Sequence, residues 1–207
     1  MESQARGGTR WRRFGLVMVP SVAATAAIGI ALAQGALAAS FAVSGQEFKV
    51  SADSLDGHGL VQYGSLVRPS GQGPQPVVVS AFDSADIVNL CQSVVIPGVP
   101  FLGEVTMRIN AGSDPDNPVH AENLFIDIAQ LDADAVFSNI DIGVSVDEAT
   151  EGMDLPENST VPGSFAQQAE HAYLSDVEQT AWATSAGTFR LTDLSLRLSR
   201  GDDAECF

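Results

Sequence analysis

The chain has 207 residues, 45% of them hydrophobic, which suits one folded domain with an apolar core and excludes a wholly disordered polypeptide. The formal net charge is −16 at pH 7, and residues 1–38 carry four arginines against one glutamate, so the remainder carries −19. A domain this acidic is not expected to bind nucleic acid or anionic lipid headgroups, because phosphate binding needs a basic surface. High negative charge favours solubility, and binding of cations or a basic partner is the alternative interpretation.

The N-terminal segment, residues 1–38, has the layout of an export signal. A cluster of arginines precedes an uncharged apolar stretch at residues 14–33. The small residues that signal peptidase needs around its cleavage site follow, at Ala36, Ala38 and Ala39. If it were not cleaved, the stretch 14–33 would be long enough to anchor the chain in a membrane. Both alternatives place residues 39–207 outside the cytoplasm as one acidic domain.

Alternation of apolar and polar residues with a period of two dominates residues 39–207 and predicts β-strands. The clearest alternating runs lie at residues 48–52, 105–109, 131–137, 140–146 and 194–198. Turns rich in Gly, Pro and Asp separate these runs. We therefore predict a mainly β fold, a single antiparallel domain that is elongated and repetitive.

A short phrase recurs three times in the predicted strands. It consists of an aliphatic residue, any residue, a glutamine and a hydroxyl-bearing residue, with the glutamines at Gln62, Gln92 and Gln179. In stacked β units such glutamines bond to one another in a ladder, so this phrase predicts neighbouring strands linked through them.

The segment near residues 165–183 has two interpretations. Its Ala, Gln and Glu content, its near-helical spacing of apolar residues and the preceding Pro162 predict a short helix. The phrase around Gln179 predicts a strand instead, and the sequence leaves both alternatives open.

The two cysteines, Cys91 and Cys206, both lie in the part predicted to be exported. An even number of cysteines in an oxidising compartment predicts a disulfide. This bridge would close a loop of about 115 residues, tying the penultimate residue to the middle of the chain.

The sequence offers no recognisable catalytic or cofactor motif. The Gly-x-Ser-x-Gly turn of many serine hydrolases is absent, and each of the three histidines, His58, His120 and His171, is expected to be an ordinary surface or hydrogen-bonded residue. Acidic turns near Asp114 and Asp202 offer oxygen ligands but do not match a calcium-binding loop. We therefore predict no catalytic residues, no metal site and no cofactor.

Longer motifs that are specific as a set occur along nearly the whole chain. They are Arg10-Trp-Arg-Arg-Phe14, Gln62-Tyr-Gly64, Cys91-Gln-Ser-Val94, Gln179-Thr-Ala-Trp-Ala-Thr184 and Cys206-Phe207. With these motifs the chain resembles the actinobacterial domain-of-unknown-function 6230 family. The resemblance implies an envelope or secreted protein, with a neighbouring multi-span membrane protein as a candidate partner. Some members are labelled cholesterol esterase, but the family supplies no catalytic residues to carry over.

Three hypotheses for the function follow. The leading one is a non-enzymatic cell-envelope or secreted protein whose β domain has a structural or binding role. The alternatives are a lipid or sterol-ester hydrolase, and a carrier of a lipid or another hydrophobic small molecule, which would need a lined cavity.

Overall fold

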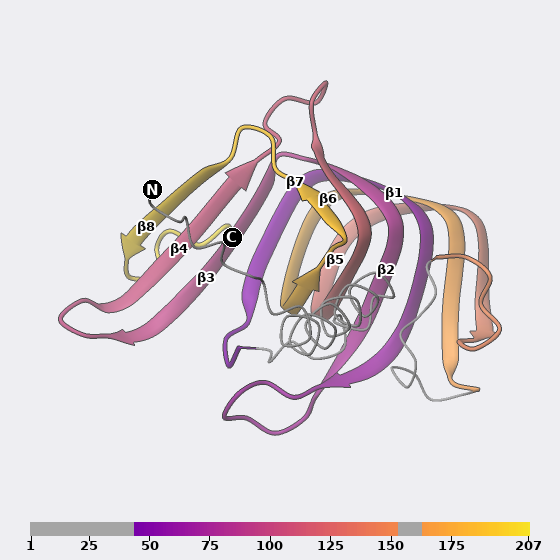
Figure 1. Cartoon of the computed structure of the whole chain (residues 1–207), viewed down its shortest axis with the longest axis horizontal. Helices are drawn as coiled ribbons and strands as arrows, with labels where there is room; N and C mark the ends of the chain where they lie inside the picture. Colours follow the sequence, from indigo (N-terminus) through magenta and orange to yellow (C-terminus); the bar gives the residue numbers. More distant parts are fainter. Residues whose placement is uncertain (1–43, 153–162) are drawn as a thin grey trace, which may run out of the picture. The chain divides into compact units, whose positions relative to one another are not determined.

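The structure, a computed structural model, describes residues 44–152 and 163–207, and Figure 1 traces these residues in colour. Their secondary structure consists of strands β1 (Phe48–Val67), β2 (Gln75–Val88), β3 (Leu90–Val99), β4 (Gly103–Ala111), β5 (Val119–Ser145), β6 (Phe165–Ser185), β7 (Thr188–Arg190) and β8 (Ser195–Arg200). The predicted signal segment, its cleavage positions and the predicted anchor all fall outside the described residues. Among the described residues, no helix has the length and apolar character needed to cross a membrane.

The eight strands form one antiparallel sheet in the order β2–β5–β6–β1–β3–β4–β8, with β7 paired to β5. Strand β1 also pairs with β2, so β1, β2, β5 and β6 close into a ring. The long strand β5 makes the closure possible, because residues 119–128 pair with β2 and residues 125–145 pair with β6. The mainly β, antiparallel prediction is confirmed, whereas the closure into a ring was not anticipated.

One row of residues crosses the ring and interrupts the alternation on each strand. We call it the corner row, and in lateral order it contains Asn139, Glu170, Gly59, Asp83 and Asn123. Its glycine and both asparagines have φ values between 53° and 60°, a backbone region that these residue types adopt more readily than others. The strands bend at this row, and inward-facing side chains are spaced there by three residues instead of two.

The corner row explains why residues 165–183 resemble a helix in sequence. The helical interpretation is wrong, because β6 spans Phe165–Ser185 as a continuous strand. Its buried residues include Ala169, Ala172 and Val177, and their spacing resembles that of a helix. The spacing of three between Ala169 and Ala172 arises at Glu170 in the corner row. The alternation is interrupted a second time at Asp176, which has a φ of 51°. The buried residues Leu174 and Val177 on either side of it are therefore also three positions apart.

Small residues let the ring close over a narrow interior. The larger interior side chains include Leu55, Leu60, Phe82, Leu124 and Ile126, and the small ones include Ala85, Ala121, Ala169 and Ala172. Gly57 also faces inward, and a Cβ at this position would lie 2.5 Å from Phe82 Cδ1. Because real side chains do not approach that closely, any larger residue at position 57 would force Phe82 to move.

A second apolar cluster lies beyond the corner row and is covered by the loop that follows β5. It contains Val61, Tyr63, Val67, Val77, Val79, Ala81, Val146, Ala166 and Trp182. The buried Gln168 side chain holds this loop, because its Oε1 accepts hydrogen bonds from the backbone N–H groups of Thr150 and Glu151. Gly152 then approaches Val61 closely, and a Cβ there would lie 2.9 Å from Val61 Cγ1.

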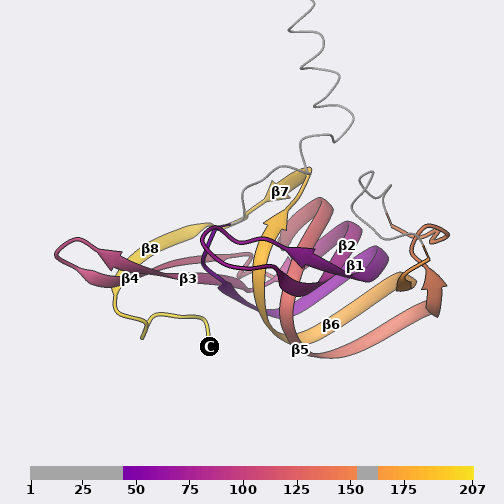
Figure 2. The ribbon, with the colours of Figure 1, turned by 90° about the horizontal axis from the view of Figure 1, so that it is seen from below.

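Strands β3, β4 and β8 extend from the ring, and we call them the wing (Figures 1 and 2). One face of the wing is covered by the C-terminal tail, where Cys91 and Cys206 are bonded with an S–S distance of 2.07 Å, the pairing that the sequence predicts. Lys49 Nζ also contacts the Glu205 carboxylate at 3.0 Å. The predicted strand at residues 194–198 largely coincides with β8, but its leucines are more than half exposed instead of forming core.

Candidate functional site

A pocket of about 140 Å³ lies inside the ring. Its wall is mostly aliphatic and aromatic and comes from all four ring strands: Leu55, Leu60, Phe82, Ile126, Ile128, Leu131, Ala133, Ala135, Phe137, Leu174 and Val177. Ala133 and Ala135 on β5 are exposed to solvent, so the pocket opens at this strand. The alternating run at residues 131–137 therefore lines a cavity with its inward-facing side chains.

The polar part of the pocket wall comes from the side chains of Gln62, Ser80 and Gln179, of which the first two are hydrogen-bonded to each other. Gln62 Nε2 donates to Ser80 Oγ at 2.7 Å, and Gln167 Nε2 donates to Gln62 Oε1. Gln179 completes the polar lining and is almost fully buried. These groups give an otherwise apolar pocket a small number of fixed polar positions, an arrangement common in ligand sites.

The predicted ladder of Gln62, Gln92 and Gln179 is not formed, which corrects the interpretation of the repeated phrase. Gln92 and Gln179 both lie opposite Val50, on β3 and β6 respectively, so an apolar residue separates them. Gln62 bonds to Gln167, which is its cross-strand neighbour on β6. The phrase marks strands correctly, but the register places Gln62 in a different row from Gln92 and Gln179, and Val50 keeps these two apart.

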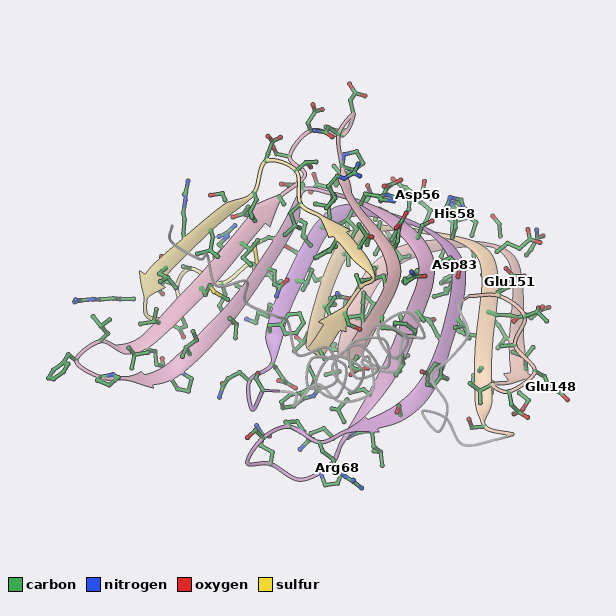
Figure 3. All side chains as sticks on the ribbon, in the orientation of Figure 1. Asp56, His58, Arg68, Asp83, Glu148 and Glu151 are labelled. Atoms are coloured by element: carbon green, nitrogen blue, oxygen red, sulfur yellow. A yellow bond between two sulfur atoms is a disulfide. The ribbon has the colours of Figure 1, made fainter. Side chains whose placement is uncertain are left out.

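The outer face of the ring carries a cluster of two histidines and one aspartate. Asp56 and His58 are two residues apart on β1, so both point outward, and His171 on β6 lies directly opposite His58. His171 Nε2 is 2.6 Å from Asp56 Oδ1, and His58 Nε2 is 3.8 Å from the same oxygen. The two imidazole centroids are 4.8 Å apart. Figure 3 shows Asp56 and His58 next to each other on the curved strands.

The third histidine, His120, lies on the same outer face but has other partners. Its Nδ1 is 2.7 Å from Asp86 Oδ1, and its Nε2 is 3.9 Å from Glu122 Oε1. Asp86 in turn lies directly opposite Asp56 across β1 and β2. Two facing carboxylates repel each other, and a histidine beside each one offsets that repulsion when it carries a proton.

The outer-face cluster does not have the geometry of a serine hydrolase site. Ser84 lies opposite His58 and Ser138 lies opposite His171, but the ring nitrogen contacts of these histidines go to the Asp56 carboxylate. The cluster is also on the face of the sheet opposite the apolar pocket, so a lipid in the pocket would not reach it. A triad needs a nucleophile within hydrogen-bond reach of the base and a substrate site beside both.

The acidic turns considered as oxygen ligands have local partners of their own. The Asp114 carboxylate accepts a hydrogen bond from the backbone N–H of Asp116, which stabilises the turn. Asp132, a further exposed carboxylate that lies within strand β5 and not in a turn, accepts a hydrogen bond from the side chain of Gln130. These contacts account for the exposed carboxylates as turn and surface residues.

Three carboxyl groups among the described residues, all outside the cluster, have shifted pKa values. Burial raises the pKa of Asp83 on β2 and of Asp127 on β5, because the charged form loses water there. Hydrogen bonds from the Ser145 hydroxyl and from the backbone N–H of Gly163 lower the pKa of Asp147, whose Oδ1 accepts both. Asp147 thereby joins the two ends of the loop between β5 and β6, which is a structural role.

The sequence predicts that each of the three histidines is a surface or hydrogen-bonded residue, and it does not bring any of them together. The sequence Asp-Gly-His at residues 56–58 could have predicted that Asp56 and His58 lie side by side, because residues two apart on a strand point to the same face. His171 is more than a hundred residues away, and only strand pairing places it beside His58.

These features define a class of protein: a disulfide-bonded antiparallel β domain whose sheet closes around an apolar pocket. The chain belongs to the family described as "Family of unknown function (DUF6230)", whose sequence profile matches residues 44–207. The family resemblance drawn from the motifs is thereby confirmed. No curated protein and no solved structure matches the chain significantly.

Proposed function

We propose that the chain is a non-enzymatic protein that works outside the cytoplasm and binds an apolar group in the pocket of its ring. The observation that carries the proposal is the pocket itself, with eleven apolar side chains in its wall and polar groups only from Gln62, Ser80 and Gln179. Burial of hydrocarbon against such a wall is favourable by about 25 cal/mol per Å².

The size of the pocket limits the ligand. Its volume of about 140 Å³ is close to that of an engineered cavity that holds benzene, and below the roughly 300–1,000 Å³ of sites for drug-sized molecules. A whole sterol ester does not fit. The opening beside Ala133 and Ala135 suits a hydrocarbon chain whose end enters the ring while the rest stays outside.

Binding of a fluorescent fatty acid such as cis-parinaric acid tests this proposal. We expect saturable binding, and Ala135→Trp should weaken it at least about tenfold, because two or more methylene groups worth about 0.8 kcal/mol each lose their place. Val136→Trp is the matched control, since residue 136 is 64% exposed and points to the outer face. Equal losses in both variants, or no saturable binding in the wild type, would contradict the proposal.

Export is supported by the arginine-flanked apolar segment in residues 1–38 and by the Cys91–Cys206 disulfide, since such bonds persist in oxidising compartments. We expect the intact mass of protein from the culture medium to correspond to a chain that begins at Ala39 and lacks two hydrogens. An uncut chain in the membrane fraction would support the anchored alternative. A reduced, uncut chain in the cytoplasm would contradict export altogether.

The non-enzymatic assignment rests on the separation between the pocket and the histidines. A hydrolase of lipid esters needs its nucleophile and base at the pocket mouth. Here the outer-face cluster is on the other side of the sheet. Covalent labelling by a fluorophosphonate probe would contradict this assignment and favour the hydrolase alternative.

A further inference from the structure

The outer-face cluster of Asp56, His58 and His171 brings three ligand atoms within 4.8 Å of one another, one from each side chain. We propose that these three side chains bind a divalent transition-metal ion, of which Zn²⁺ is the best match, and that the ion links β1 to β6. This site is independent of the apolar pocket, because the two lie on opposite faces of the sheet.

The observed distances are close to those of a zinc site. Zn²⁺ with bonds of about 2.0–2.1 Å in tetrahedral geometry separates neighbouring ligand atoms by about 3.3 Å. The two distances from Asp56 Oδ1, 2.6 Å to His171 Nε2 and 3.8 Å to His58 Nε2, lie on either side of that value. All three ligand atoms lie within 4.8 Å of one another, so the largest adjustment needed to reach the zinc spacing is about 1.5 Å. The His58 side chain is 64% exposed and has room to make it.

The donor set selects the kind of metal. Ca²⁺ and Mg²⁺ prefer ligand sets made of oxygen atoms, whereas imidazole nitrogens suit Zn²⁺ and its transition-metal neighbours. Two imidazoles and one carboxylate supply three protein ligands, which leaves a fourth position for water. The sulfur atoms of Cys91 and Cys206 are bonded to each other, so a thiolate site does not compete in the described part of the chain.

The surrounding structure supports a fixed cation site. Asp86 faces Asp56 across β1 and β2 and adds a second negative charge beside the ligands. The net charge of −19 outside residues 1–38 also raises the local concentration of cations. His58 and His171 both adjoin the corner row, where Gly59 and Glu170 set the bend of the strands and hence the spacing of the ligands.

Isothermal titration of the untagged, metal-stripped protein with ZnCl₂ tests the proposal. We expect one Zn²⁺ per chain in the wild type, with affinity reduced at least about tenfold in His58→Ala, His171→Ala and Asp56→Asn, because each removes one ligand. His120→Ala is the matched control, since this histidine lies on the same face with a carboxylate partner but outside the cluster. It should bind Zn²⁺ as the wild type does.

Thermal melts without metal show whether each variant is folded, and the shift in melting temperature on adding Zn²⁺ gives a second readout. A stabilising shift that occurs in the wild type and in His120→Ala but not in His171→Ala supports the ion as a link between strands. Three results would overturn the proposal: no stoichiometric binding by the wild type, equal weakening by His120→Ala, or retained affinity in the His58→Ala/His171→Ala double variant. The last would show binding by the acidic surface alone.

Discussion

Removal of the Cys91–Cys206 disulfide should lower the free energy of unfolding by about 4–5 kcal/mol. The bridge spans 115 residues of sequence, and in the chain-entropy model a loop of that length restricts the unfolded chain by about this amount. For a domain of this size the melting temperature should fall by about 10–20 °C. The measurement is thermal and denaturant unfolding of Cys91→Ala/Cys206→Ala beside the wild type.

This experiment isolates the effect of the disulfide on the unfolded chain, because other contacts hold the C-terminal tail in place in the folded state. The Cys206 backbone N–H donates to Ser93 Oγ at 3.0 Å, and Thr106 Oγ1 donates to the Gly201 carbonyl. Lys49 holds Glu205 as well. These contacts remain in the variant, so the tail keeps its place in the folded state. Wild-type protein in reductant should match the variant, and a loss below about 1 kcal/mol would show that the bridge is dispensable.

Truncation of Leu124 to alanine should cost about 2–5 kcal/mol, whereas truncation of Leu198 should change stability by less than about 0.5 kcal/mol. Leu124 is 1% exposed on β5 at the point where this strand turns from β2 toward β6, and its removal leaves a cavity inside the ring. Leu198 lies on β8 of the wing and is 66% exposed.

Denaturant unfolding of the two variants compares the same chemical change in two environments. If Leu198→Ala lowers the free energy of unfolding by more than about 1 kcal/mol, the leucine face of the wing must be buried against another surface in solution. A loss below about 1 kcal/mol in Leu124→Ala would mean that the ring interior collapses easily around a missing side chain.

The sequence predicted strands wherever alternation ran without a break, and it became ambiguous where the backbone left the β region. Phe137 and Ile140 show this clearly: these two inward-facing side chains of one strand are three positions apart instead of two, because Asn139 has a φ of 53°. The same spacing between Ala169 and Ala172 favoured a helix in β6. A single strand does not reveal a corner row, since the row exists only when interruptions on neighbouring strands align.

By itself, the sequence determined that this is an acidic, mainly β domain with two cysteines able to pair, because composition and local periodicity encode these properties directly. Only the tertiary structure decided that β1, β2, β5 and β6 close into a ring, that Gln62 bonds to Gln167, and that His171 meets His58 and Asp56. The physical reason is the same in each case. Alternation specifies the face on which a side chain lies, whereas its neighbours on that face depend on strand order and register between segments far apart in the chain.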